Sequence, residues 1–246
     1  MKYTNICTGK FIDRPNRFIA NVEINGDVKS VHVKNTGRCK ELLIPGAKVL
    51  LQYFPDSQEA NNYSEESLKN RKMAYDLISV YKNANIKRLI NMDSQVPNKV
   101  VHEWLLDPSS SAKREFGQIT YIKPESVYGN SRFDFYFETN KKKIYMEVKG
   151  VTLENNDIVS FPDAPTTRGV KHVYELIEAK GAGHESVLMF VIQMKGVSYF
   201  TPAILQDPDF AKALTEAKKA GVKIIAYDCN VTRTTIGINE KVKIKL

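Results

Sequence analysis

The sequence predicts a two-part protein of the α/β class, in which a small all-β part precedes a larger α/β domain. Short alternating strands separated by turn signals fill the first part, and helical spacing of apolar residues first appears near residue 95. Beyond that point, strand-like runs alternate with helical ones. The chain has 246 residues, of which 42% are hydrophobic, enough for one large or two modest domains. We therefore predict domains over residues 1–82 and 83–246.

In the first part, alternation of apolar and polar side chains predicts the strands. Asn25-Gly26-Asp27 and Pro45-Gly46 are turn signals between them. Several short strands within about 80 residues are typical of a small β-barrel or sandwich. The strands are expected at Phe18–Ile24, Val28–Val33, Ala47–Tyr53 and Met73–Tyr81, and the polar residues 55–71 are expected to form a loop.

The second part reads as α-β-β-β-α-β-α-β. Asp93 or Ser94 is expected to cap a helix that continues to about Leu106, and Gly181 and Gly221 each follow a predicted helix as a stop signal. Tight turns separate the first three strands. After the first helix, strands are expected at Gln118–Ile122, Arg132–Glu138, Lys143–Val151, Val187–Gln193 and Val222–Tyr227, and helices at Thr167–Lys180 and Asp207–Ala220.

The charge is concentrated at the two ends of the chain. The net charge is +8, with nine Lys/Arg against four Asp/Glu in residues 1–52 and seven against two in residues 218–246. Basic surface of this kind favours a polyanionic partner, because phosphate contacts release counterions. The alternative is that the basic residues only aid solubility.

The apolar stretches and the cysteines indicate where in the cell the protein is expected. No stretch approaches the roughly 20 apolar residues of a membrane span, and the N-terminus lacks the apolar core of a signal peptide. The cysteines, Cys7, Cys39 and Cys229, lack CxxC spacing, which argues against a disulfide framework and a structural zinc site. We therefore predict a cytoplasmic protein without a membrane partner.

The residues that indicate chemistry are Asp134, Glu147 and Lys149. Glu147 and Lys149 are two apart on one predicted strand, so they share a face, and a turn at residues 139–141 can bring Asp134 beside them. Two carboxylates suit Mg²⁺ or Mn²⁺, and the lysine can position a water or offset charge on a phosphate. The alternative is an exposed Glu/Lys pair on a half-buried strand.

Several further motifs resemble one known family, over nearly the whole chain. They are Arg14-Pro15-Asn16-Arg17-Phe18, Asn35-Thr36-Gly37-Arg38 with Glu41-Leu42, Pro45-Gly46, Gly129-Asn130-Ser131-Arg132-Phe133-Asp134-Phe135, Glu147-Val148-Lys149-Gly150-Val151-Thr152-Leu153, and Phe161-Pro162-Asp163-Ala164-Pro165-Thr166-Thr167-Arg168-Gly169 with Lys171-His172 and Glu175-Leu176. Together these motifs resemble the sugar fermentation stimulation protein A family.

The resemblance implies a fold and a function. It implies an N-terminal OB-like barrel and a C-terminal α/β core with a mixed sheet, similar to PD-(D/E)xK nucleases. It also implies sequence-independent DNA binding and a part in regulating sugar (maltose) metabolism. Phe133 precedes Asp134 where the nuclease pattern has proline. This variation is tolerated in the pattern, so a metal site is still expected.

Nuclease cores of this type add a carboxylate from outside the two strands. Glu103, on the helix before the strands, and Glu125, in Lys123-Pro124-Glu125, are the candidates, although Glu103 could instead be a surface acid of the helix. Arg168 is a candidate phosphate ligand, and Asp163 could cap the following helix or orient Arg168. His172 and Glu175 are three apart on that helix and so share a face. Arg132 and Lys171 are further candidate nucleic-acid ligands.

Four basic residues of the first part are candidate phosphate ligands. Basic residues among aromatic ones suit an OB-type groove that follows a phosphate backbone. We assign Phe18 to the barrel core. The four basic residues are Arg14, Arg17, Arg38 and Lys40.

Three functions remain to be distinguished. The first is a Mg²⁺- or Mn²⁺-dependent nuclease with Asp134 and Glu147 as metal ligands, and the second is a DNA-binding regulator of sugar metabolism genes without catalysis. The third, a glycoside hydrolase with two carboxylates, fits poorly with a lysine between the acids and a basic surface. The sequence has neither a phosphate-binding P-loop nor a serine-hydrolase elbow.

Overall fold

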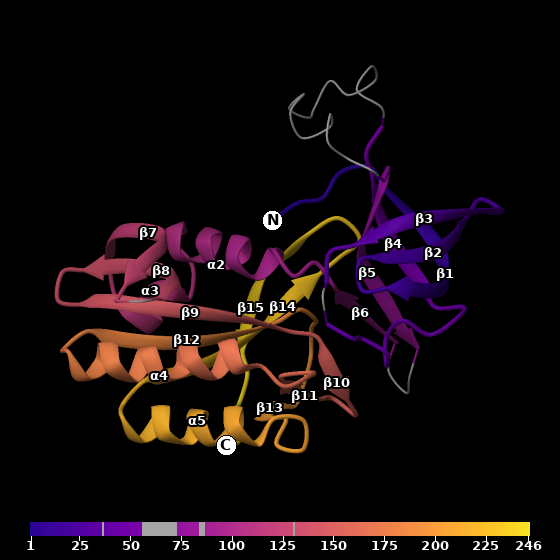
Figure 1. Cartoon of the computed structure of the whole chain (residues 1–246). Helices are drawn as coiled ribbons and strands as arrows, with labels where there is room; N and C mark the ends of the chain where they lie inside the picture. Colours follow the sequence, from indigo (N-terminus) through magenta and orange to yellow (C-terminus); the bar gives the residue numbers. More distant parts are fainter. Residues whose placement is uncertain (36, 56–72, 84–86, 130) are drawn as a thin grey trace. The chain divides into compact units, whose positions relative to one another are not determined.

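The computed structural model describes residues 1–35, 37–55, 73–83, 87–129 and 131–246, and the chain divides into two compact units (Figure 1). The barrel unit comprises Lys2–Gln95 and Val231–Ile236, and the α/β unit comprises Met1, Val96–Asn230 and Gly237–Leu246. The sequence places the division near residue 83; residues 87–91 belong to the barrel unit because they pair as a strand with the preceding one. The loop predicted over residues 55–71 lies, beyond Pro55, outside the described residues.

The barrel unit is a closed five-stranded barrel. Its hydrogen-bonded order is β3-β2-β1-β4-β5, and a further pairing of β3 with β5 closes the ring, while β6 pairs with β5. This confirms the OB-like barrel. The strands are β1 (Ile6–Asn16), β2 (Ile19–Ile24), β3 (Asp27–Val33), β4 (Lys48–Tyr53), β5 (Tyr75–Asn83) and β6 (Lys87–Asn91).

Alternation explains the strands that the sequence predicts. Ala20, Val22 and Ile24 of β2 are buried, and the hairpin into β3 turns at Asn25 and Gly26, whose φ angles of 52° and 91° suit these two residue types. Strand β1 is not predicted, because it is irregular: its register against β2 shifts between Phe11 and Asp13 and again before Asn16.

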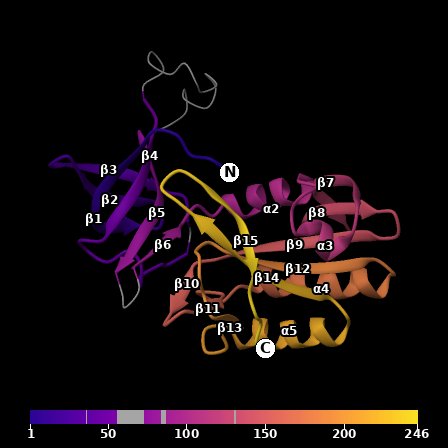
Figure 2. The same cartoon turned by 180° about the vertical axis from the view of Figure 1, so that it is seen from behind.

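The α/β unit is built on a mixed sheet, as the resemblance implies, and the sheet has a sixth strand, β15, that the sequence does not predict. Its order is β15-β14-β12-β9-β8-β7, with β9, β12 and β14 parallel and with β7, β8 and β9 antiparallel. Figure 2 shows this sheet from behind. The strands are β7 (Ile119–Tyr128), β8 (Ser131–Thr139), β9 (Lys143–Val151), β12 (Glu185–Ile192), β14 (Lys223–Val231) and β15 (Ile236–Lys241).

Helices cover both faces of this sheet (Figure 1). Helix α2 (Val96–Leu106) contacts β7 and β9, whereas α4 (Thr167–Gly181) contacts β9 and β12 and also packs against α5 (Pro208–Lys219). A short helix, α3 (Ala112–Phe116), follows α2. Strand β9 is therefore covered on both sides, and its alternate residues face different helices.

A small second sheet and the cap of α4 differ from the sequence expectation. Strands β10 (Leu153–Asn155), β11 (Ile158–Phe161) and β13 (Tyr199–Pro202) form a three-stranded sheet that the sequence does not predict, because each strand is short. The cap of α4 is Thr166 rather than Asp163, since the Thr166 side chain accepts a hydrogen bond from the Gly169 amide at 3.0 Å.

Among the described residues, no helix is both long enough and apolar enough to cross a membrane.

Candidate functional site

Asp134 and Glu147 lie on the adjacent strands β8 and β9, where the hydrogen-bonded ladder ends. Phe135 pairs with Met146, and Asp134 and Glu147 are the next residues of the two strands. Beyond this pair, the Asp134 side chain replaces a backbone acceptor, because its Oδ2 accepts from the Val148 amide at 2.7 Å. The sequence pattern therefore brings the two carboxylates together as predicted.

Lys149 completes the predicted trio. It lies two residues after Glu147 on β9, and its Nζ is 2.6 Å from Glu147 Oε1. The Glu147 residue is only 3% exposed, so the ion pair is largely withdrawn from water. This excludes the alternative of a Glu/Lys pair exposed on the solvent face of the strand.

A histidine from α4 binds the same carboxylate oxygen. Nδ1 of His172 is within hydrogen-bonding distance of Glu147 Oε1, and Arg168 Nε lies 3.5 Å from His172 Nε2, one turn earlier on the helix. Because His172 is buried and Arg168 is exposed, these side chains lead from the buried carboxylate toward solvent. We call Lys149, Glu147, His172 and Arg168 the Glu147 cluster.

The two carboxylates have pKa values that shift in opposite directions. Burial, reinforced by the nearby charge of Glu147, raises the pKa of Asp134. Burial also acts to raise the pKa of Glu147, but the hydrogen bond with His172 and the charge of Lys149 outweigh it and hold that pKa below its usual value. Glu147 is therefore a stable anion, and it makes a second negative charge on Asp134 unfavourable unless a cation is present.

One oxygen of Glu147 has no hydrogen-bond partner. Both contacts made by Lys149 and His172 are to Oε1, whereas Oε2 is buried and unpartnered in the described structure. A buried carboxylate oxygen without a partner is unfavourable and calls for a donor, a water or an ion. Asp134 and this oxygen therefore fit a hard divalent cation as a pair of oxygen ligands.

The structure supplies two carboxylates here and not three. In the described parts of the chain, no group of three or more His, Cys, Asp or Glu side chains is arranged to hold a metal. This is compatible with Mg²⁺, which retains several water ligands and is often held by one or two carboxylates together with substrate phosphate oxygens.

Asn98 is a site residue that the sequence does not reveal. It lies in the first turn of α2, and its Nδ2 donates to Asp134 Oδ1 at 2.7 Å. With the Val148 amide on Oδ2, this bond fixes both oxygens of Asp134. No local pattern signals this contact, because it joins a helix start to a strand 36 residues later.

The two additional acids predicted from the sequence do not join the pair. Glu103 lies on the exposed face of α2, where its carboxylate forms an ion pair with the N-terminal ammonium group of Met1. Glu125 is on β7, and its exposed carboxylate pairs with Arg132 at 3.2 Å. Glu125 has a φ of 51°, which departs from the extended backbone of its strand.

The predicted cations near the site are engaged to different degrees. Arg132 is exposed and pairs with Glu125, and Lys171 is exposed and lies 3.5 Å from Glu175 on the same helix. Both cations are themselves exposed and therefore accessible to a phosphate. Arg168 is the cation that contacts His172 of the Glu147 cluster directly.

Arg14 has a structural role rather than the predicted phosphate contact. Its guanidinium donates to four backbone carbonyls: from Nη1 to Gly37 at 2.8 Å and Arg38 at 2.9 Å, and from Nη2 to Arg17 and Asn35, both at 2.6 Å. The terminal N–H groups are thus occupied within the barrel. Arg14 ties the β1–β2 turn to the segment that follows β3.

Phe18 also differs from the prediction. It is 45% exposed rather than buried in the barrel core, and the Arg17 guanidinium lies 4.7 Å from the centre of its ring. Arg38 and Lys40 are exposed, as their predicted role requires. The core position is taken instead by Phe11, which is 2% exposed.

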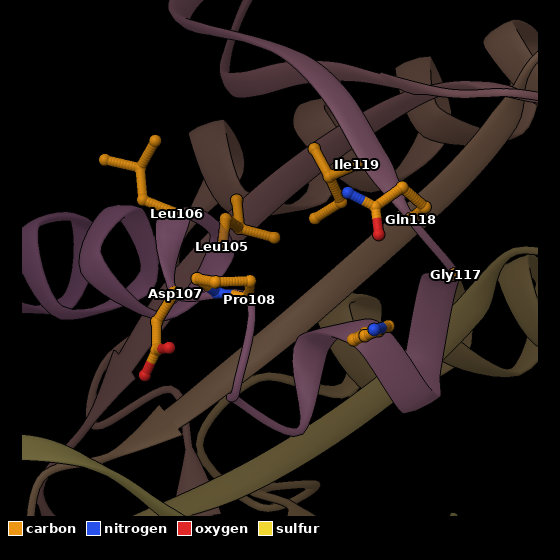
Figure 3. Close-up of a pocket in the computed structure, with 8 residues that line it drawn as sticks. Leu105, Leu106, Asp107, Pro108, Gly117, Gln118 and Ile119 are labelled. Carbon is orange, nitrogen blue, oxygen red and sulfur yellow. The ribbon is translucent and has the colours of Figure 1, made fainter.

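A small pocket of about 130 Å³ lies elsewhere in the α/β unit (Figure 3). It is lined by the end of α2, the residues that follow it and the start of β7, including Leu105, Asp107 and Ile119. It contains no residue of the Asp134–Glu147 site, so the proposed chemistry does not involve it.

Two family models match consecutive parts of the chain. The model described as SfsA N-terminal OB domain matches residues 12–92, and the model described as Sugar fermentation stimulation protein RE domain matches residues 95–235. Together they cover most of the chain, and they divide it close to the boundary between the two compact units.

Similar proteins match over the full length. A sugar fermentation stimulation protein homolog from Desulfitobacterium hafniense (strain DSM 10664 / DCB-2) is 52% identical over 246 residues, covering 100% of this chain and 99% of the relative. A homolog of the same description from Clostridium beijerinckii is also 52% identical, covering 100% of both chains. A solved structure, described as Pyrococcus Furiosus SfsA in complex with Ca2+, matches with a TM-score of 0.81 and 25% identity, covering 100% of this chain and 98% of that one.

Proposed function

The chain belongs to the sugar fermentation stimulation protein family, and we propose that it is a metal-dependent nuclease that hydrolyses phosphodiester bonds of nucleic acid. One observation carries the proposal. Two carboxylates on adjacent strands, Asp134 and Glu147, meet beside the partly buried Lys149, and one buried oxygen of Glu147 lacks a hydrogen-bond partner in the described structure. A protein that only bound a polyanion would gain nothing from acids at this position.

Asp134 and Glu147 would hold the cation. The Ca²⁺ complex of the similar Pyrococcus protein supports a divalent ion, and the oxygen ligands suit Mg²⁺ or Mn²⁺. When bound, such an ion polarises the scissile phosphate and lowers the pKa of a water molecule. Asn98 and the Val148 amide orient Asp134 for this role.

The other residues of the Glu147 cluster support the reaction in other ways. Lys149 offsets the negative charge that grows on the phosphate as the P–O bond breaks. His172 holds Glu147 through Oε1, which leaves Oε2 as the oxygen that would hold the cation. Arg168, exposed beside His172, binds a neighbouring phosphate oxygen and so places the strand.

The nucleic-acid partner is supported by charge. The net charge of +8 and the basic character of both ends of the chain favour a polyphosphate, and the OB-type barrel is a fold that often binds nucleic acid. We propose sequence-independent binding of DNA that weakens steeply as salt increases.

A second function is favoured by a specific observation. Both oxygens of Asp134 and one of Glu147 already have donors within the protein. A site that is retained but inactive would show the same hydrogen bonds from the protein to its carboxylates. The alternative is thus a DNA-binding regulator of sugar metabolism genes that does not cleave.

The experiment is a cleavage assay with labelled single- and double-stranded DNA and RNA, in Mg²⁺, in Mn²⁺ and in excess chelator. Glu147→Gln and Lys149→Ala are assayed beside the native chain. The nuclease proposal predicts cleavage by the native chain, its loss in both variants and its loss in chelator. Binding without cleavage in every condition would support the regulator, and absence of both binding and cleavage would exclude both functions.

A further inference from the structure

Phe18 is unusual among the phenylalanines of this protein. In the described structure it is the exposed one, at 45%, whereas the others are buried or half-buried. It lies at the turn between β1 and β2 on the barrel unit. An exposed aromatic ring that is not used in the core is a common feature of surfaces that bind a flat, apolar ligand face.

The backbone that carries this ring is fixed. The amides of Phe18 and Ile19 donate to Asn16 Oδ1 at 2.9 and 3.1 Å, and the Phe18 carbonyl accepts from the Val33 amide at 2.7 Å. The ring is therefore presented by an ordered turn, so a ligand that stacks on it need not first order the backbone.

One positive charge lies directly beside the ring. The Arg17 guanidinium lies 4.7 Å from the ring centre, and Arg17 is itself exposed. Arg14 joins the backbone of Arg17 to that of Asn35 and Gly37, which places this turn beside the segment that leads to the exposed Lys40. The nearest acid of β1, Asp13, accepts a hydrogen bond from the side-chain amide of Asn21.

We propose that Phe18 and Arg17 form a stacking site for an unpaired nucleobase, so that the barrel unit binds single-stranded nucleic acid. The inference rests on the nucleic-acid binding proposed above and specifies its form. An aromatic ring beside a cation matches a base on a phosphate backbone, because the ring takes the base and the cation takes a phosphate. In a duplex the faces of the bases are already stacked on one another, so an unpaired base is required.

The test is equilibrium binding of full-length protein to a labelled oligothymidylate of about 16 nucleotides, in chelator so that no strand is cut. An oligouridylate, an abasic strand of the same length and a closed hairpin duplex are compared with it. The variants are Phe18→Ala, Phe18→Leu and Arg17→Ala. Val28→Ala is the matched control, since Val28 is 63% exposed on β3, where it pairs with the far end of β2.

The proposal predicts that Phe18→Ala weakens binding to oligothymidylate about fivefold to a hundredfold, with no change in the salt dependence. Phe18→Leu loses most of the same affinity because it lacks an aromatic face, and Val28→Ala keeps it. On the abasic strand, Phe18→Ala and the native chain bind equally. Arg17→Ala lowers the slope of log affinity against log salt by about 0.7, the value for one phosphate contact on a single strand.

Two results would overturn the stacking site while leaving the nuclease proposal in place. One is native affinity of Phe18→Ala for oligothymidylate, and the other is an equal loss on the abasic strand or on the closed duplex. If the native chain bound no nucleic acid at low salt, the stacking site and the proposed function would both be wrong.

Discussion

His172 of helix α4 and Glu147 of strand β9 are joined by a hydrogen bond between Nδ1 and Oε1. The same oxygen lies 2.6 Å from Lys149 Nζ. Two donors on one oxygen leave the other oxygen of the carboxylate unpartnered and fix its direction. The orientation of the proposed metal ligand therefore depends on a residue of the helix, not only on the strand motif.

His172→Ala should lower the cleavage rate about ten- to a hundredfold and raise the Mn²⁺ concentration needed for half-maximal activity, because Glu147 loses one of its two fixed donors. His172→Asn should restore much of the activity, since its side-chain amide can donate from nearly the position of Nδ1. Single-turnover rates at several Mn²⁺ concentrations measure both effects. Equal loss in the two variants would show that a donor at the position of Nδ1 does not support Glu147.

Arg14→Ala should destabilise the barrel by about 1–3 kcal/mol, because four backbone carbonyls lose a charged donor. Urea unfolding, followed by far-ultraviolet circular dichroism, measures the change. Lys40→Ala is the control, as it removes an exposed cation that follows the same segment. Weaker DNA binding by Arg14→Ala without any loss of stability would instead support the phosphate contact that the sequence predicts.

Gly150→Ala should destabilise the α/β unit by about 1–3 kcal/mol through overpacking. A Cβ at this position would lie 2.6 Å from Gln193 Oε1 and 2.7 Å from Pro97 Cγ, and both of these residues are buried. Gly181→Ala, at the end of α4, meets nothing within 4 Å and should be neutral or slightly stabilising. Thermal unfolding of the two variants beside the native chain decides; equal melting temperatures would contradict the prediction.

Stability should fall as the pH is lowered from about 5 toward 2, in part because of Glu115. Burial acts to raise the pKa of Glu115, but hydrogen bonds from Lys223, Lys241 and Tyr227 outweigh it and lower that pKa to about 2. A carboxyl whose pKa is lower in the folded state stabilises the fold above its unfolded pKa and loses this contribution as the pH falls through its folded pKa.

Glu115→Gln should therefore remove about 1–2 kcal/mol at neutral pH and flatten the decline of stability below pH 5; the figure allows for screening of the partly exposed lysines. Urea unfolding at a series of pH values, for the native chain and the variant, measures it. Parallel pH profiles would show that Glu115 does not contribute.

The sequence predicts the strands that carry the site because their apolar residues alternate. Phe133, Phe135 and Phe137 are all buried on one face of β8, which places Asp134 on the other. The two-residue spacing of Glu147 and Lys149 and the turn before β9 then suffice to bring three charges together. These features are local, so a single sequence contains them.

Other features depend on contacts between distant segments and could not be predicted locally. Asn98 bonds to Asp134 across 36 residues, and nothing in its own segment distinguishes it from a surface asparagine. Glu103 occupies a helix position that suits a third ligand by order in the chain, but it lies on the exposed face of α2. Arg14 and Phe18 depart from their expected roles: the contacts of Arg14 are to backbone carbonyls as far as residues 35–38, and Phe18 lies exposed in the turn after the irregular strand β1.

The most direct measurement is the rate of Mn²⁺-dependent cleavage of a labelled DNA strand by Asp134→Asn beside Glu103→Gln. Both variants replace one carboxylate with an amide, one in the proposed metal site and one on the exposed face of α2. The proposed function predicts a loss of about a hundredfold or more in Asp134→Asn and native activity in Glu103→Gln. Native cleavage by Asp134→Asn, or no cleavage by the native chain with any divalent ion, would contradict it.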